Sequence, residues 1–444
     1  TAQNFTTATT TGNTAVGYLA GGEVTTGIDN TLIGATAGDA LTLGTRNVAL
    51  GKSALSSDTL GSRAVAIGGG ALFTQNFTTA TDSLNTAVGF LAGFAGTTGV
   101  SNTLIGAEAG DALTDADNNV AVGRRALTSD TLGSRSTAIG NNALHNQNFT
   151  TATNTYNTAV GYEAGVLLTT GVENTLLGAL AGDAIGTGST NTAVGYASLS
   201  TNTKGNANTA VGYESLNTAN LGSDTDANNA GLGFRAAYSV TTGLQNTMLG
   251  SRAGFGSGTS TRTTTGSDNT LVGYFARTNA AGTNQANCFG SSLGGDSGYT
   301  TIGYSSSDIR AAHGNVTWAT VSDVRYKKDI VDSTAGLSFI NALQPRTFKY
   351  KTLGELPETF SAYEADSTEV YKNSNTNHGF IAQEVKTAID NHPELKDGFK
   401  LWDDRSDGSQ EVGEAALIPI LVKAIQEQNA LIVALTARVA TLEG

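Results

Sequence analysis

A short repeat nested inside a longer one constrains this chain more than any other feature of its sequence. The five-residue unit Asn-Thr-Ala-Val-Gly, or a close relative, starts fifteen times between Asn13 and Asn269. The starts are separated by 17, 17, 17 and then 21 residues, which sum to 72, so Asn13, Asn85, Asn157 and Asn229 are equivalent positions. Repeats of fixed period indicate one small unit per period, which buries its apolar side only by stacking on its neighbours.

Each repeat has the composition of one coil of a β-solenoid. It holds three or four β-prone residues and a Gly at a fixed place, so we expect the Gly at a corner with positive φ and small Ala and Val side chains in a narrow interior. The recurring Asn would form a ladder in which each amide bonds the amide one coil further on. Residues 17 apart, such as Val16 and Ile33, would stack about 4.8 Å apart. Helix is disfavoured, because Thr, Gly and Asn dominate and no apolar stripe of period 3.6 persists.

Composition divides the chain into two domains. Residues 1–320 carry 12 basic and 19 acidic side chains, whereas the last 124 residues carry 13 and 19. All four prolines lie in the last part, and 49 of the 56 glycines lie before residue 321. Composition therefore predicts two domains. Together with the repeat and with the family resemblance of the last 123 residues described below, it leads us to predict a mostly β protein, with a β-solenoid rod over 1–305, a junction over 306–321 and an α+β domain over 322–444.

Charge and cysteine content exclude several classes of function. The net charge is −13 and no block of Lys and Arg occurs, so nucleic acid is not an expected partner. No run approaches the 18 or so apolar residues of a membrane span, so membrane insertion is not expected. The single cysteine, Cys288, excludes a disulfide framework or a thiolate metal cage, and we expect neither a metal nor a cofactor. The chain begins at Thr1 without a signal-peptide pattern, as a fragment or processed chain would.

The rod sequence resembles the head repeats of trimeric autotransporter adhesins and related phage fibre shafts. The shared feature is the series of short Ala-Ile/Val-Gly words across roughly residues 10–305. This resemblance implies a β-roll in which three chains pack together. The alternative is a generic β-solenoid spacer.

A Ser and a Lys five residues apart follow the junction. Ser322 and Lys327 stand in the sequence Ser322-Asp323-Val324-Arg325-Tyr326-Lys327. A Ser hydroxyl becomes a nucleophile when a base takes its proton, and a Lys amine kept neutral by burial is such a base. The alternative is a solvated turn, because a Ser followed by basic residues is usually that.

Four stretches of the last 123 residues resemble the intramolecular chaperone domain of phage endosialidases, tailspikes and tail fibres. They are Ser-Asp-x-Arg-x-Lys at 322–327, Leu-x-Pro-x-x-Phe within 343–350, Gly-x-Ile-Ala-Gln-Glu-Val within 378–385, and the closing helix from Leu417. The resemblance implies that three such domains assemble, guide folding of the preceding β-rich trimer and then cut themselves off. Carried over, the cleaved bond is Val321–Ser322, with Ser322 as nucleophile and Lys327 as base. Asp323 and Arg325 match the motif as supporting residues or as a structural pair, and His378 and Glu384 receive no role.

The closing helix, expected over 415–443, carries an apolar seam. Heptad positions a and d are Ile418, Leu421, Ile425, Gln428, Ile432, Leu435, Val439 and Leu442. This pattern predicts a coiled coil in which Gln428 pins the register, and the homotrimer itself follows from the family resemblance because the heptads do not specify three strands. The alternative is a helix packed within one chain.

These observations predict a trimeric tail fibre of a virion that binds a host glycan or protein receptor and attaches upstream to the tail. Single-turnover self-cleavage would be its only enzymatic activity. Phe5, Phe77 and Phe149 recur in the 21-residue steps and are candidate receptor contacts or core plugs. A polysaccharide depolymerase, with paired carboxylates, and a bacterial trimeric surface adhesin are the alternatives. Asp39, Asp111 and Asp183 repeat with the 72-residue period and have the pattern of structural residues.

Overall fold

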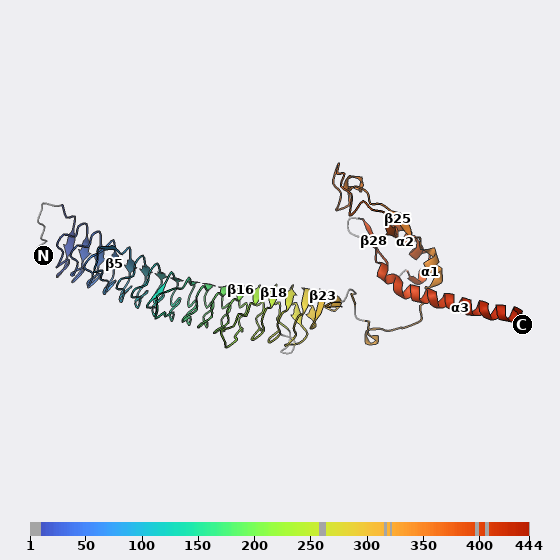
Figure 1. The fold of residues 1–444 in the computed structure, drawn as a ribbon, viewed down its shortest axis with the longest axis horizontal. Helices are drawn as coiled ribbons and strands as arrows, with labels where there is room; N and C mark the ends of the chain where they lie inside the picture. The colour runs from blue at the N-terminus through green and yellow to red at the C-terminus, as the bar shows by residue number, and fades with distance from the viewer. Residues whose placement is uncertain are drawn as a thin grey trace. The chain divides into compact units, whose positions relative to one another are not determined.

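The computed structural model describes residues 10–256, 263–314, 318–319, 322–395, 399–404 and 408–443. The chain forms two compact units, Thr1–Val321 and Ser322–Gly444 (Figure 1). Each unit is described by itself.

The first unit is a β-solenoid of 17-residue coils, each contributing one short strand to a single long sheet. Within the described residues this sheet has eighteen strands, and all but the last, β24, pair in parallel. The parallel strands are β1 (Thr14–Val16), β2 (Thr31–Ile33), β3 (Val48–Leu50), β5 (Val65–Ile67), β7 (Thr86–Val88), β8 (Thr103–Ile105), β9 (Val120–Val122), β11 (Thr137–Ile139), β13 (Thr158–Val160), β14 (Thr175–Leu177), β15 (Thr192–Val194), β16 (Thr209–Val211), β17 (Ala230–Leu232), β18 (Thr247–Leu249), β19 (Thr270–Val272), β21 (Asn287–Ser291) and β23 (Tyr299–Tyr304). Val16 pairs with Ile33, as the 17-residue spacing predicts.

Two-stranded sheets form at the second corner of some coils. They pair β4 (Gly61–Ser62) with β6 (Thr81–Asp82), β10 (Gly133–Ser134) with β12 (Thr153–Asn154), and β20 (Arg277–Thr278) with β22 (Gly294–Gly295). The first two pairs span the 21-residue steps, so the longer coils keep the parallel stacking of the others.

The middle residue of each short strand points into the rod. Ala66 and Ala121 have no exposed surface, and Leu32 and Leu104 are almost fully buried. The expectation that Val also points inward is wrong: successive residues of a strand face opposite sides, so the Val that follows each central Ala lies on the outer face. Val16, for example, is 57% exposed.

The Gly after each strand is required by the close stacking of coils. Gly106 has φ +135°, and a Cβ added there would lie 2.5 Å from the carbonyl oxygen of Gly123 one coil on. Equivalent glycines in the other coils have the same geometry, for instance Gly34 and Gly178 with φ +137°. The expected corner with positive φ is confirmed.

The Asn ladder exists, but its main bonds run to the backbone. Asn174 Oδ1 accepts from the backbone N–H of Asn191 at 3.0 Å, and its Nδ2 donates to the Gly188 carbonyl at 2.9 Å. The same pair of bonds recurs in most coils from Asn13 to Asn269. Direct bonds between amides, such as Asn191 Nδ2 to Asn174 Oδ1 at 3.2 Å, are additional. Each buried amide therefore satisfies backbone groups that the tight corner would leave without a partner.

Two of the three 21-residue coils replace the Asn by a buried polar network, whereas the third keeps Asn208 in the ladder. Ala64 occupies the ladder position, and Gln75 Nε2 donates to Asp58 Oδ2 at 2.7 Å while Asn85 Nδ2 donates to Gln75 Oε1 at 2.9 Å. The Asp58 carboxylate also accepts from the backbone N–H of Phe77 at 3.3 Å. The recurring Gln-Asn-Phe sequence thus builds the corner of the longer coil.

The rod ends in an antiparallel hairpin. The last parallel strand, β23, pairs with β24 (Ser307–Ala312), in which Ile302 faces Ile309. Arg310 then forms an antiparallel bridge with Ala319. The sheet therefore continues past residue 305, into what the sequence predicted to be the junction.

The second unit is α+β with short elements. It comprises η2 (Val324–Tyr326), α1 (Leu337–Ala342), β25 (Arg346–Phe348), η3 (Leu353–Glu355), β26 (Asn377–Gly379), α2 (Ala382–Asp390), η4 (Pro393–Leu395), β27 (Trp402–Asp404), β28 (Gln410–Val412), η5 (Glu414–Ala416) and α3 (Leu417–Glu443). β25 pairs with β26 and β27 with β28, both antiparallel. A core around Phe339 joins α1 and α2 to the start of α3.

Helix α3 is buried only at its N-terminal end. Leu417, Ile420 and Ala424 pack into the core, whereas the a/d seam faces solvent, with Ile425 64% and Leu435 63% exposed. The seam is therefore a different face from the one that packs within the chain. By length and composition, the 30-residue helical stretch Glu414–Glu443 is apolar enough to cross a membrane, which the sequence reasoning did not note.

Candidate autoprocessing site

Ser322 and Lys327 are in direct contact at the start of the second unit. Lys327 Nζ donates a hydrogen bond to Ser322 Oγ over 2.7 Å. Both side chains belong to solvent-exposed residues. The nucleophile and base of the predicted dyad are thus within proton-transfer distance in a single chain.

A one-turn 3₁₀ helix explains why a five-residue spacing brings the two groups together. In η2, Tyr326 N–H donates to the Asp323 carbonyl at 3.1 Å and Lys327 N–H to the Val324 carbonyl at 3.0 Å. The chain turns back within three residues, so the Lys side chain returns to the Ser that precedes the turn.

Asp323 and Arg325 pair with each other. Arg325 Nη2 lies 2.6 Å from Asp323 Oδ2, and Arg325 Nε donates to both carboxylate oxygens at 3.0 and 3.1 Å. Asp323 Oδ1 also accepts from the backbone N–H of Arg325 at 2.8 Å, which caps η2. The Arg325 guanidinium holds the pKa of the Asp323 carboxyl below its usual value. These contacts favour the structural role, in which the pair fixes the turn that carries the dyad.

Apolar side chains around the dyad are unburied. Val324 is 65%, Tyr326 79%, Ile330 65% and Val331 86% exposed. Exposed apolar side chains this close in the chain to a candidate nucleophile are typical of a segment that becomes covered on assembly. Val321 lies outside the described residues, so the predicted scissile bond has no described geometry.

The contacts described for His378 and Glu384 are with residues other than Ser322 and Lys327. Arg346 donates to the two Glu384 oxygens at 2.8 and 3.0 Å, which lowers the pKa of that carboxyl. This ion pair ties β25 to α2. His378 sits on β26 opposite Thr347 and is exposed.

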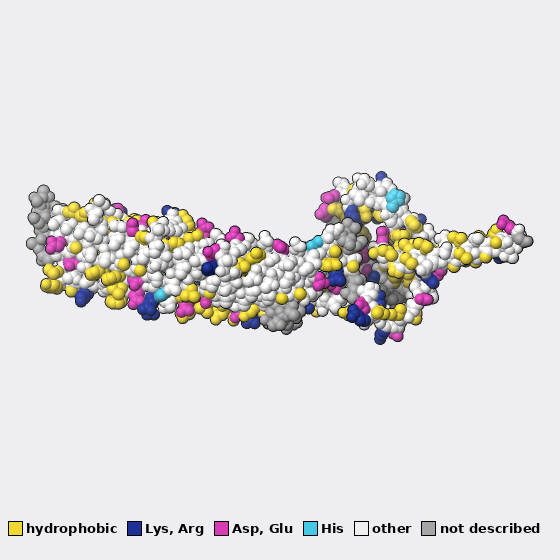
Figure 2. Space-filling model, turned by 60° about the horizontal axis from the view of Figure 1, so that its bottom comes forward, with side chains coloured by type: hydrophobic (Ala, Val, Ile, Leu, Met, Phe, Trp, Pro, Cys, Tyr) yellow, Lys and Arg dark blue, Asp and Glu magenta, His cyan; other side chains and the backbone are white. Residues whose placement is uncertain are grey.

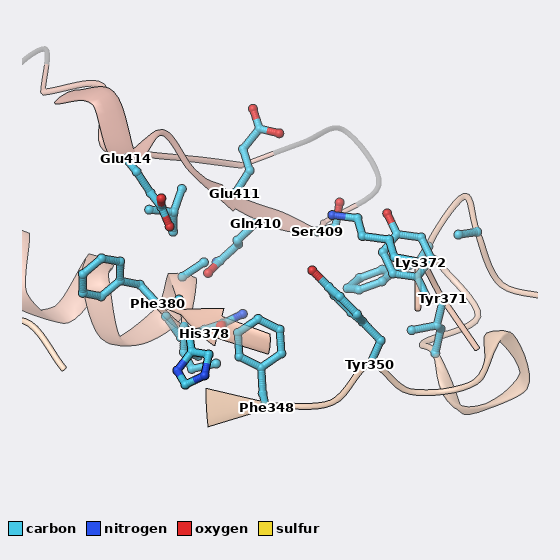
Figure 3. A pocket seen from close by; sticks show the side chains of 18 of the residues that line it. Phe348, Tyr350, Tyr371, Lys372, His378, Phe380, Ser409, Gln410, Glu411 and Glu414 are labelled. Carbon is cyan, nitrogen blue, oxygen red and sulfur yellow. The ribbon is translucent and has the colours of Figure 1, made fainter. Parts of the chain in front are cut away.

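A pocket of about 680 Å³ lies beside His378 in the second unit. Tyr350, Tyr371 and Lys372 lie on one side of it, and Phe380 and Glu414 on the other (Figure 3). Tyr350 and Tyr371 meet edge to face with centroids 5.7 Å apart. Neither Ser322 nor Lys327 lines this pocket.

The receptor-contact candidates in the rod are buried where they are described. Phe77 is 5% and Phe149 7% exposed, which favours the core-plug interpretation. Phe5 lies outside the described residues. Sequence reasoning missed the buried carboxylates at the backbone of these residues: Asp58 accepts from the Phe77 N–H and from Gln75, and Asp130 accepts from the Phe149 N–H and from Gln147. The signal was the Gln that precedes each Phe by two residues.

The repeated rod carboxylates bind hydroxyl groups one coil on. Ser56 donates to Asp39 and Ser200 to Asp183, each at 2.5 Å, and Thr128 donates to Asp111. These bonds make the three carboxylates part of the coil stacking, which supports their structural interpretation.

Comparison with protein families places the start of a known domain at the candidate nucleophile. Residues 322–393 match the Peptidase S74 family, described as Chaperone of endosialidase, and the match begins at Ser322. The second unit contains a chaperone of endosialidase domain. Two of the other stretches that suggested this domain, at 343–350 and 378–385, lie inside the match, and the closing helix lies beyond it. No curated protein and no solved structure matched the chain. Chaperone domains of this family act as trimerising, autoproteolytic folding domains and are typical of phage tail fibres.

Proposed function

We propose that this chain is the β-solenoid shaft of a homotrimeric, receptor-binding viral tail fibre, whose chaperone domain drives trimerisation and folding and then cuts the Val321–Ser322 bond. The observation that carries the proposal is the 2.7 Å contact between Ser322 Oγ and Lys327 Nζ at the first residue of the matched domain. Its proposed location is the virion tail, with an extracellular trimeric adhesin as the alternative. A receptor would be a host glycan or protein.

The proposed cleavage is an acyl shift followed by hydrolysis. Ser322 Oγ attacks the carbonyl carbon of Val321, and the neutral Lys327 amine takes the hydroxyl proton. The protonated Lys327 then gives that proton to the departing amide nitrogen of Ser322, which leaves an ester between Val321 and Ser322 Oγ. One water hydrolyses the ester and frees the Val321 carboxylate and the Ser322 hydroxyl.

Assembly would switch this chemistry on. In the single chain the Lys327 side chain is exposed, and its Nζ lies 2.7 Å from Ser322 Oγ. Covering Val324, Tyr326, Ile330 and Val331 in a trimer would also remove water from Lys327, and desolvation favours the neutral amine. Cleavage would then report that the preceding rod has assembled, and the released rod would be kinetically trapped.

The test compares the parent chain with Ser322→Ala and Lys327→Ala on a denaturing gel over time. The parent should convert from the 45.2 kDa chain to two fragments, and both variants should stay at full length. Lys328→Ala is the matched control, because it removes the adjacent exposed lysine and leaves the dyad, so it should be cut at the parental rate. The mechanism is wrong if the trimeric parent stays uncut or if Ser322→Ala is cut as fast as the parent. Mass spectrometry of the new N-terminus should identify Ser322.

A further inference from the structure

Aromatic rings and guanidinium groups contact one another on the outside of the rod between residues 213 and 275. We call this group the aromatic–arginine patch; its members are Tyr213, Phe234, Arg235, Arg252, Tyr274 and Phe275. Tyr213 stacks on Phe234 with centroids 5.4 Å apart, and Tyr274 meets Phe275 edge to face at 5.0 Å. The patch therefore contains two pairs of rings on different coils.

Arg252 joins the two pairs of rings. Its guanidinium carbon lies 5.7 Å from the ring centroid of Phe234 and 5.2 Å from that of Phe275. These two rings belong to the coils before and after that of Arg252, since the Arg252 N–H donates to the Phe234 carbonyl and the Phe275 N–H to the Ser251 carbonyl. A guanidinium that lies on ring faces keeps its N–H groups for another partner.

The positive charge of Arg252 has no carboxylate partner among the described residues. Arg235 pairs with Glu214 over 2.7 Å, whereas none of the described ion pairs contains Arg252. The net charge of the chain is −13, so an uncompensated cation among aromatic rings stands out on this rod. It is a site to which a negatively charged partner is attracted.

The patch is also accessible. Phe234 is 41% and Tyr274 51% exposed, and Arg252 is partly exposed. In the surface view of Figure 2, hydrophobic side chains gather in patches along the rod, and charged side chains are scattered between them. The aromatic–arginine patch combines both kinds of side chain within a few coils.

Coil stacking does not require these side chains. Counted from the ladder position of each coil, Arg252 corresponds to Leu180 and Glu108, and Tyr213 corresponds to Asn141. The coils of Leu180 and Glu108 pair with their neighbours through the same parallel register. The rings and the cation are thus additions to a fold that forms without them, as expected for a binding site carried on a scaffold.

The spacing of the coils leaves room for one ring inside the patch. Phe234, Ser251 and Tyr274 occupy the same position in three successive coils. Two coil spacings place the backbones of Phe234 and Tyr274 about 10 Å apart. Neighbouring rings sit about 4.5–7 Å from each other, and the Ser251 side chain is small. The gap between Phe234 and Tyr274 therefore admits a single further ring, and Arg252 reaches the rings on both sides of it.

We propose that the aromatic–arginine patch binds an acidic glycan, a linear saccharide whose sugar rings carry carboxylates. One sugar presents its flat C–H face to the aromatic rings, and its carboxylate accepts two hydrogen bonds from Arg252, the geometry that a guanidinium favours. Three coil steps from Tyr213 to Tyr274 span about 14 Å, so the patch is long enough for a short run of sugars. This inference deepens the proposed function and rests on it, because it names the receptor class and its site on the fibre.

Other partners fit the patch less well. Single-stranded nucleic acid also stacks on aromatic rings, but it brings a phosphate with every nucleotide and needs a groove of several cations, whereas one unpaired cation lies here. An anionic membrane surface likewise attracts clusters of Lys and Arg. A protein, including a second copy of this chain, could use Tyr and Arg as anchors, and the experiment distinguishes that case.

The experiment measures binding of the full chain to immobilised oligosaccharides. The probes are oligomers of uronic acids and oligomers of sialic acids, which carry the same carboxylate chemistry from two sources, each beside its methyl ester as the uncharged counterpart. The variants are Arg252→Gln and Tyr274→Ser; Ser is already present at this position in Ser251. Arg124→Gln is the matched control, because Arg124 is an exposed cation at the position of Tyr274 in an earlier coil, outside the patch.

We expect the parent to bind at least one of the two acidic series and to bind its methyl ester at least about tenfold more weakly. Arg252→Gln and Tyr274→Ser should each weaken binding of the acidic oligomer at least about tenfold, and Arg124→Gln should bind as the parent does. A parent that binds neither acidic series, or binds the methyl ester equally well, overturns the inference. So does parental binding by Arg252→Gln.

Light scattering and a denaturing gel on the same samples separate this inference from the proposed function. A parent that is trimeric and cuts itself but binds no acidic oligomer contradicts the glycan site alone. A parent that stays a single chain, or a trimer that stays uncut, contradicts the proposed function. If Arg252→Gln dissociates the parental trimer, the patch is a contact between copies of the chain and the glycan site is overturned.

Discussion

The rod and the chaperone domain bury their side chains in different ways. In the rod almost every coil places its central strand residue out of water, and a buried Asn amide or its substitute satisfies the corner backbone. In the chaperone domain the 27-residue helix α3 buries only Leu417, Ile420 and Ala424, and its heptad seam is exposed. The rod leaves separate apolar side chains such as Leu43, Leu84 and Leu167 exposed along its coils, whereas the chaperone domain leaves the seam of its longest helix and the surroundings of its dyad uncovered. This difference teaches that, within the described residues, the rod closes its core coil by coil, whereas the chaperone domain leaves one long apolar seam on its surface.

The largest expected effect tests the stacking of the rod. Gly106→Ala would place a Cβ 2.5 Å from the Gly123 carbonyl oxygen and 2.6 Å from its carbon, at φ +135°, so two coils must move apart. We expect a loss of about 4 kcal/mol of unfolding free energy or local opening of the rod, measured by thermal unfolding of the uncut Ser322→Ala chain. Gly282→Ala is the control, because its Cβ would meet only Thr265 Oγ1 at 3.5 Å. Equal behaviour of the two variants would contradict the stacking geometry.

A somewhat smaller effect tests the Asn ladder. Asn174→Ala leaves the backbone N–H of Asn191 and the carbonyl of Gly188 buried without their partner. Each such group costs about 1–3 kcal/mol, so we expect a loss of about 3 kcal/mol in the same unfolding measurement. Thr170→Ala, on the same coil but exposed, should change stability by less than about 0.5 kcal/mol. A loss as small for Asn174→Ala would mean that water replaces the ladder bonds.

A substitution at the polar seam position of the chaperone domain is expected to raise stability, in contrast to the two rod substitutions. Gln428 is exposed in the single chain and would lie inside a coiled coil of α3 helices. Gln428→Leu should stabilise the assembled helix by about 1 kcal/mol per chain, seen as a higher melting temperature of the chaperone domain in the uncut Ser322→Ala trimer. Its control is Gln426→Leu, outside the a/d seam. If both changes act alike, the seam is not the contact face.

The smallest expected effect is a difference in how the stability of the rod and that of the chaperone domain depend on pH. Burial raises the pKa of Asp58, Asp111 and Asp183 in the rod, so these groups contribute stability at acid pH that is lost as pH rises through the folded pKa. Hydrogen bonds from Arg325 and Arg346 lower the pKa of Asp323 and Glu384 in the chaperone domain, so their contribution is present above the unfolded pKa and lost as pH falls through the folded pKa.

Between pH 6 and pH 3 we therefore expect the thermal transition of the chaperone domain to fall relative to that of the rod, followed by calorimetry of the uncut Ser322→Ala chain. The variant Arg325→Gln, Arg346→Gln is the control and should weaken the acid dependence of the chaperone transition. A rod transition that falls more steeply than the chaperone transition would contradict the assigned directions.

Much of the candidate site followed from the sequence because its spacing is local. Ser322 and Lys327 lie within one turn of chain, so a family motif and a five-residue spacing were enough to bring them together. The roles of Asp323 and Arg325 were open in the sequence, since only the η2 geometry decides that the two side chains bond each other. The burial of Phe77 was equally undecided, because its backbone partner Asp58 lies nineteen residues away.

The sequence by itself determined the coil length, the register and the corner glycines of the rod, since a fixed period in a linear chain imposes the same period on stacked coils. The shift in charge and proline also predicted two domains, but not that the sheet of the rod continues through β24 (Ser307–Ala312). Only the tertiary structure decided which side of each strand faces inward. A Thr-Ala-Val strand has an apolar residue on both faces, so its pattern does not say which face is buried. The space inside the rod, which is small enough to favour Ala, depends on the strand and on the corner residues packed across from it, such as Leu41 beside Leu32. The valines thereby lie on the outer face of the rod, which no local pattern could place.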